Sequence, residues 1–339
     1  MGDKISGRNT ALDGLRGYAA LGVALGHSVL AITGLDLWGK SLRDFPHMAA
    51  SAIFYRMLSL VAPSDAAVML FFVLSGHVIW QSFKRKSLGR PAVPDYLVSR
   101  IIRLFPLIVV SSVLIGLLKH AGLGAILRTA ILWDVALNGV LWSLQVEVIG
   151  SVVIVLVWLF ARQSAARLLA ALAVSLLILP LVRGTPLVFM PAFLLGAVIG
   201  LAPERVWRGR WLFGAGLALL VGTNIVIGHG GATRLPEMTG ATLVVGCMGA
   251  LPVRALRTRV SKFLGEISYP FYLVHPIGMI FGFHAVAGLA FVPVLGRIVI
   301  FAAVSIAVAI PLAWLLHIAV EMPAMRQGRR VKLRRAIHV

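Results

Sequence analysis

Long apolar segments, separated by short polar or basic stretches, make up most of the chain from residue 11 onward. Hydrocarbon offers no water to the backbone, so a run of roughly 18 or more apolar residues is typical of a membrane-spanning α-helix. We therefore predict an all-α polytopic membrane protein with about ten transmembrane helices. The predicted spans are 11–32, 61–82, 101–119, 143–161, 165–182, 187–202, 211–229, 237–252, 267–289 and 296–320.

The basic residues between these spans predict the orientation. Cytoplasmic loops of membrane proteins are enriched in lysine and arginine. If the N-terminus is cytoplasmic, about three of every four of the 32 Lys and Arg residues fall on that side. We expect residues 1–10 to form a cytoplasmic N-terminus, 11–323 a transmembrane domain and 324–339 a basic cytoplasmic tail.

Composition narrows the class of partner. A hydrophobic content of 59% with only 13% charged residues fits a bilayer and no soluble domain. The net charge of +20 would suggest nucleic acid, but the basic residues lie between hydrophobic segments, so we expect no nucleic-acid partner. The single cysteine and the lack of zinc or P-loop motifs predict no metal site and no tightly bound cofactor.

The first span carries Asp13, Arg16 and His27. Ionisable residues inside a span indicate a functional site that faces the protein interior. Arg16 and His27 are 11 positions apart, which returns them to one helix face about 16 Å along the axis. Asp13 lies three positions before Arg16 on the same face. The alternatives are a histidine that bonds only a carbonyl, and a signal peptide.

Small residues predict close helix crossings. Gly22 and Gly26 in the first span form a small-xxx-small pair, and Ser75 with Gly76 would allow a crossing in the second span. His77 follows directly and is a candidate ligand-facing group, although packing is the alternative.

Two arginines open the third span. Arg100 and Arg103 are three positions apart and share one face at the start of a helix that contains Pro106. Guanidiniums donate paired hydrogen bonds to phosphate oxygens, so this pair indicates a phosphate-binding site. The alternative is an ordinary positive-inside signal.

The fourth span places Glu147 about one turn inside hydrocarbon. A carboxylate there needs a cation or a proton, and its candidate partners are Arg16, His27 or a substrate hydroxyl. Trp142, at the start of the span, is either an interfacial anchor or part of a carbohydrate site.

Two prolines, Pro270 and Pro276, predict an irregular ninth span with His275 at the break. Irregular backbone at membrane depth is tolerated where it lines a cavity. His284 and His317 lack comparable neighbours, and we expect both to be structural.

Taken together, these segments resemble the membrane-bound acyltransferase 3 family from residue 11 to about 323. The motifs that carry the resemblance are Asp13-Gly14-Leu15-Arg16 with His27, Phe71 to Gly76, Arg100 and Arg103 with Pro106, Trp142-Ser143-Leu144 with Glu147, and Ser268-Tyr269 with Tyr272 to Pro276.

The resemblance implies a multi-pass protein of the bacterial inner membrane that O-acylates an extracytoplasmic or lipid-linked carbohydrate. It implies a cytoplasmic acyl-CoA donor, most simply acetyl-CoA, and partner proteins of a polysaccharide pathway. His77 departs from the family pattern, which has an aromatic or aliphatic residue there. A transporter or flippase of a polysaccharide pathway is the alternative function, because it also places charges in its spans.

Acyl transfer to a hydroxyl needs a base, a cation for the oxyanion and a grip on the donor. The resemblance implies an essential pair, Arg16 and His27, and we assign His27 as general base or transient acyl carrier. The predicted catalytic residues are His27, Arg16, Asp13 and Glu147. The predicted donor-binding residues are Arg100, Arg103 and Arg16. The predicted substrate-binding residues are Trp142, Ser143, His275 and Tyr272.

Overall fold

The computed structural model describes residues 10–34, 37, 39–86, 93–228 and 230–328. All regular structure in these ranges is helical, as predicted. The α-helices are α1 (Thr10–Thr33), α2 (Ala50–Val61), α3 (Ser64–Lys86), α4 (Val93–Leu118), α5 (Leu123–Ala130), α6 (Trp142–Ala161), α7 (Ala165–Leu177), α8 (Met190–Val198), α9 (Glu204–Trp207), α10 (Arg210–Leu217), α11 (Thr223–Ile227), α12 (Arg234–Ala250), α13 (Arg259–Val286) and α14 (Val294–Leu316). Two π-helical segments, η7 (Ala218–Gly222) and η10 (His317–Glu321), continue α10 and α14.

Within the described ranges, six helical stretches are long and apolar enough to cross a membrane. They are Thr10–Thr33, Ala50–Lys84, Val93–Leu118, Gly139–Ala161, Arg210–Ile227 and Val294–Gly328. Two shorter apolar stretches, Ala165–Leu177 and Pro186–Leu201, lie beside them in sequence. The protein is therefore a polytopic helical membrane protein, while ten spans and cytoplasmic termini stay predictions. The predicted N-terminus up to residue 9 and the basic tail from residue 329 lie outside the described residues.

Large apolar side chains cover the outside of the helices. In water such a surface would drive association, but in a bilayer it faces lipid of the same polarity. Among the most exposed are Leu117, Leu156, Phe160, Leu177, Val299 and Leu315.

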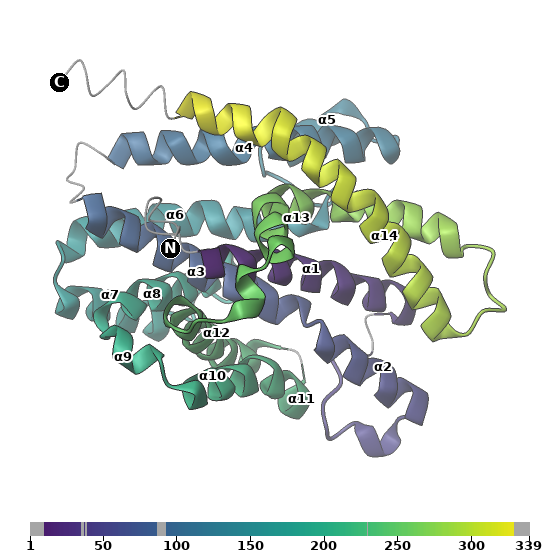
Figure 1. Cartoon of the computed structure of the whole chain (residues 1–339), viewed down its shortest axis with the longest axis horizontal. Helices are drawn as coiled ribbons and strands as arrows, with labels where there is room; N and C mark the ends of the chain where they lie inside the picture. The colour runs from purple at the N-terminus through teal and green to yellow at the C-terminus, as the bar shows by residue number, and fades with distance from the viewer. Residues whose placement is uncertain (1–9, 35–36, 38, 87–92, 229, 329–339) are drawn as a thin grey trace.

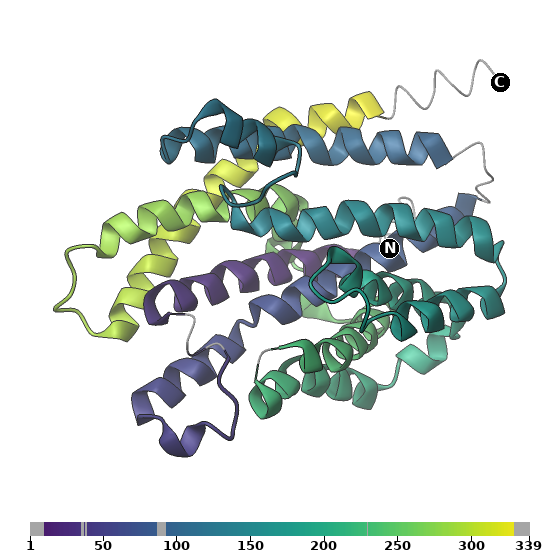
Figure 2. The ribbon, with the colours of Figure 1, turned by 180° about the vertical axis from the view of Figure 1, so that it is seen from behind.

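Helix α1 occupies the centre of the bundle (Figures 1 and 2). It packs against α2, α3, α12, α13 and α14. Two clusters of buried apolar residues flank it: one is built largely from α3, α6, α8 and α12, the other from α4, α13 and α14. Both clusters include residues of α1 and α6. The junction of the two clusters is where polar side chains from both halves can meet.

Glycines allow the closest helix crossings. A Cβ on Gly76 of α3 would overlap the backbone of Phe193 on α8, and a Cβ on Gly17 of α1 would lie 2.6 Å from the Gly265 nitrogen on α13. The crossing predicted at Gly76 is confirmed. The pair predicted in the first span is half wrong: Gly26 meets the carbonyl of Ala62, but Gly22 faces open space.

Several helices extend beyond the predicted spans. Two of the connections between predicted spans also contain helices: α2 lies within 33–60 and α5 within 120–142. Helix α13 starts eight residues early because the Thr258 side chain caps it by accepting from the Ser261 N–H. Helix α13 continues through Pro270 and Pro276, so it is not interrupted at His275, while each proline leaves one carbonyl of the preceding turn without its backbone donor.

We expect Gly76→Ala to destabilise the protein by about 2 kcal/mol, because the added methyl meets backbone that cannot rotate away. Gly22→Ala is the matched control: its methyl enters open space, and alanine favours the helix by up to about 1 kcal/mol. The measurement is the temperature at which half of the detergent-solubilised protein is lost from the monodisperse peak in size-exclusion chromatography. Equal midpoints for the two variants would contradict the crossing.

Candidate active site at the junction of two cavities

The first cavity, the arginine cavity, lies where α1, α3, α4, α6 and α13 meet. Its volume is about 80 Å³, and its charged lining groups are Arg16, Arg100, Arg103 and Glu147. Arg100 and Arg103 line the same cavity, as expected for residues three apart on one helix. Three guanidiniums against one carboxylate leave the lining with net positive charge.

Glu147 pairs with Arg100. The Arg100 guanidinium lies 2.5 Å from the Glu147 carboxylate, and their side chains are only 16% and 24% exposed. The Ser75 hydroxyl donates to the same carboxylate oxygen at 2.9 Å. The partner of Glu147 is therefore Arg100, and not one of the three partners that the sequence suggests, Arg16, His27 or a substrate hydroxyl. With Arg100 neutralised, Arg16 and Arg103 supply the excess positive charge.

Asp13 lies one helical turn before Arg16 and acts electrostatically on its guanidinium. Asp13 itself is absent from the lining of the arginine cavity, whereas Arg16 belongs to it. A carboxylate at this place can orient the Arg16 guanidinium from outside the cavity, and the catalytic role of Asp13 stays a prediction.

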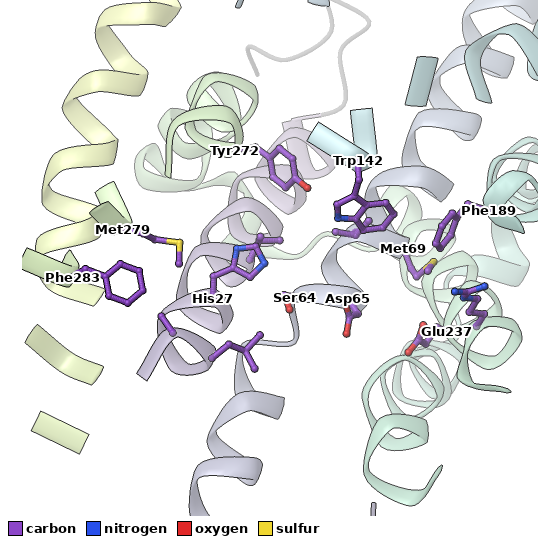
Figure 3. Close-up of a pocket in the computed structure, with 15 residues that line it drawn as sticks. His27, Ser64, Asp65, Met69, Trp142, Phe189, Glu237, Tyr272, Met279 and Phe283 are labelled. Carbon is purple, nitrogen blue, oxygen red and sulfur yellow. The ribbon is translucent and has the colours of Figure 1, made fainter. Parts of the chain in front are cut away.

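The second cavity, the histidine cavity, has a volume of about 540 Å³ (Figure 3). His27 lines it from α1, Asp65 from α3, Trp142 from α6 and both Arg234 and Glu237 from α12. Arg16 and His27 thus open into two different cavities along one helix. Their separation of 11 positions, about 16 Å, spans from one cavity to the other.

Pro276 sets the protonation pattern of a histidine. Proline has no N–H, so the carbonyl of Tyr272, four residues earlier on α13, lacks its usual helical donor. Nδ1 of His275 lies 2.8 Å from that carbonyl oxygen. A carbonyl only accepts, so His275 carries its proton on Nδ1 and presents Nε2 as an acceptor.

His275 in turn orients His27. Nδ1 of His27 lies 3.0 Å from Nε2 of His275, so in the neutral pair His27 donates its Nδ1 proton. The lone pair of His27 is then on Nε2, and the ring lines the histidine cavity. His275 is 1% exposed and belongs to the lining of neither cavity. Its two ring nitrogens are occupied by Tyr272 and His27.

Tyr272 and Val68 line both cavities and so form the partition between them. The Tyr272 hydroxyl lies 2.8 Å from the Ser143 hydroxyl, and the Phe71 ring packs edge-on against the tyrosine ring. The contact with Ser143, at the start of α6, holds the phenol in place. A group that moves from the Arg16 side to the His27 side must pass Tyr272 and Val68.

The structure gathers most of the predicted site residues. Ser143 lines the arginine cavity, Trp142 the histidine cavity and Tyr272 both. His77 lines neither, and its Nδ1 lies 3.2 Å from the Gly196 carbonyl at the crossing of α3 and α8.

Three charged residues of the histidine cavity were missed by sequence reasoning: Asp65, Arg234 and Glu237. Glu237 stands at the start of an apolar span, as Glu147 does, and the same rule for ionisable residues in spans could have found it. Asp65 stands in the first turn of α3, where a carboxylate is common for helix stability alone.

Comparison with known proteins identifies the family of the chain. Residues 9–316 match the model of the acyltransferase 3 family, which is described as an acyltransferase domain. The acyltransferase MdmB of Streptomyces mycarofaciens is 25% identical over 384 aligned positions, which cover 95% of this chain and 93% of that protein. No solved structure matches. Because the family match covers nearly the whole chain, the protein belongs to the acyltransferase 3 family and is a membrane-bound O-acyltransferase.

Proposed function

We propose that the protein transfers an acyl group, most simply acetyl, from cytoplasmic acyl-CoA to a hydroxyl of an extracytoplasmic or lipid-linked carbohydrate. The observation that carries the proposal is the His27 ring, whose Nε2 lone pair is set by His275 and whose side chain lines a large cavity beside a smaller, positively charged one. We place the protein in the bacterial inner membrane, working with partner proteins of a polysaccharide pathway.

The arginine cavity suits the acyl donor. The donor has a narrow arm with carbonyl oxygens between its phosphates and its thioester, and guanidiniums donate hydrogen bonds to such oxygens. Arg16 and Arg103 would hold this arm, while Arg100 is neutralised by Glu147. A volume of about 80 Å³ admits the narrow thioester end rather than the nucleotide head.

The histidine cavity suits the acceptor. Nε2 of His27 takes the proton of the acceptor hydroxyl as its oxygen attacks the thioester carbon. Arg16, which Asp13 orients, lies about three helical turns from this base and holds the donor from the arginine cavity. The tetrahedral intermediate collapses by breaking the carbon–sulfur bond, and the leaving thiolate takes the proton from His27. Nε2 is also the atom that a transient acyl group would occupy if His27 were the carrier.

His275 supports this step without touching the substrates. The sequence assigned His275 to substrate binding, but its ring is buried and both nitrogens are engaged. We propose a positioning role: His275 keeps Nε2 of His27 unprotonated and accepts from its Nδ1–H as the imidazolium forms. The carboxylate of Asp65, which lines the same cavity, adds a negative charge that favours that cation.

The first test replaces the base. We expect His27→Ala to lower ester formation at least about 100-fold, because a positioned general base contributes that much or more. The measurement compares surface and secreted glycans of cells that carry each variant, by mass spectrometry of labile esters. His284→Ala is the control, since His284 is exposed on α13. An ester that persists undiminished in the His27→Ala strain would remove the central claim.

The second test separates positioning from packing. We expect His275→Ala to lower kcat by about tenfold or more with little change in KM for either substrate, because His27 loses its tautomer. His275→Gln restores an acceptor for the His27 Nδ1–H and recovers part of kcat. Pro276→Ala restores a backbone N–H that competes for the Tyr272 carbonyl, so kcat falls although the helix gains a hydrogen bond.

A purely structural role for His275 predicts a different pattern. Gln would then be no better than Ala, and Pro276→Ala would be fully active. Steady-state kinetics with radiolabelled acetyl-CoA distinguish the two patterns.

The third test addresses the pairing of Glu147. We expect Glu147→Gln to destabilise the protein on the order of 3 kcal/mol, because it leaves the largely buried Arg100 guanidinium without a counter-charge. Removing both charges in Arg100→Gln/Glu147→Gln restores most of that stability. Heat inactivation in detergent measures the effect. If the double variant is no more stable than Glu147→Gln, the pairing is not the main role of Glu147.

A further inference from the structure

The wall of the histidine cavity carries three charged side chains that the chemical step above leaves without an assigned contact to substrate. They are Asp65, Arg234 and Glu237. Figure 3 labels Asp65 and Glu237 on this wall. Arg234 and Glu237 are three apart on α12, so they face the cavity together. Glu237 is 1% exposed, and holding a carboxylate at such depth costs several kcal/mol unless it is hydrogen-bonded.

Buried hydrogen bonds hold Glu237 from behind. Nδ2 of Asn224 donates to the Glu237 carboxylate at 2.6 Å. The Arg56 guanidinium donates to the Asn224 carbonyl at 2.8 Å and to the Lys40 carbonyl at 2.9 Å. Arg56 is itself 2% exposed. The carboxylate is therefore fixed by a chain of bonds through α11 and α2, which is the kind of support that a binding group requires.

Aromatic rings stand beside these charges. The Arg234 guanidinium lies 5.2 Å from the centre of the Phe189 ring, and the Trp142 ring lies 5.3 Å from the same ring. All three side chains line the cavity. The wall thus offers apolar ring faces next to two carboxylates and one guanidinium.

We propose that Asp65, Arg234 and Glu237, together with Trp142, form the acceptor subsite, and that it takes a glycosyl unit without an acidic group. The proposal rests on the proposed function. Sugar hydroxyls donate to carboxylates and accept from a guanidinium, and the C–H face of a sugar packs on an aromatic ring. Ionised carboxylates only accept, so a uronate or phosphate at this subsite would face two groups that offer it no proton.

The first experiment locates the ester. The glycan that loses its ester in the His27→Ala strain is analysed by tandem mass spectrometry to find the ring that carries the ester in the wild type. The expected ring is a neutral or amino sugar. An ester on a uronic acid, or on a phosphorylated or sulfated sugar, would overturn the assigned class of acceptor.

The second experiment tests the residues. The probes are radiolabelled acetyl-CoA and the glycan isolated from the His27→Ala strain. We expect Glu237→Gln and Arg234→Gln each to raise KM for the glycan about tenfold or more, since each loses a hydrogen bond to a charged group. KM for acetyl-CoA stays unchanged. Glu237→Gln keeps the oxygen that accepts from Asn224, so its fold is retained.

The control is Glu204→Gln, which removes a carboxylate with a 66% exposed side chain that pairs with Arg208. Its KM for the glycan stays at the wild-type value. Unchanged glycan KM in both test variants, while His27→Ala abolishes the ester, would reject the subsite and leave the proposed function intact. An ester that survives His27→Ala rejects the proposed function itself.

Discussion

The high cost of an unpaired charge inside a helical membrane bundle is the constraint on which the rest of this structure depends. Lipid and apolar protein solvate an ion poorly, so every ionisable side chain must find a partner or a cavity. The chain meets this demand by collecting its ionisable residues along α1 at the junction of two apolar clusters. Arg100 with Glu147 and His27 with His275 are the two pairs at the centre of that arrangement.

The two pairs solve different problems. The pairing of Arg100 with Glu147 joins α4 to α6 and balances a charge at the arginine cavity. The pairing of His27 with His275 joins α1 to α13 and carries no net charge while both rings are neutral. This hydrogen bond determines that Nε2 of His27 is the nitrogen that can accept a proton. It depends on Pro276, which has no N–H to donate to the Tyr272 carbonyl and so leaves that carbonyl to His275. One missing backbone hydrogen bond thereby determines which nitrogen of His27 is the acceptor.

The two cavities lie on either side of a shared partition, so the proposed donor and acceptor bind in separate spaces. Among the described residues, Tyr272 and Val68 alone line both, so two side chains form the partition between the cavities. This arrangement suits the proposed transfer, in which the donor enters one cavity and the acceptor the other. Arg16 and His27 are about three turns apart on α1, which places their side chains in different cavities.

Much of this organisation was readable from the sequence alone. The apolar runs determined a helical membrane protein, and helical spacing placed Arg16 with His27 and Arg100 with Arg103 on common faces, because periodicity is a local property. The succession of motifs also determined the family. Tertiary packing alone decided that Glu147 bonds Arg100 rather than Arg16, that His275 lies behind His27 rather than in a cavity, and that Asp65 and Glu237 line the histidine cavity. These contacts join residues up to 248 positions apart. Helices distant in sequence must pack together before such side chains come within hydrogen-bonding distance, and the close crossing of α1 and α13 at Gly17 and Gly265 is one such contact.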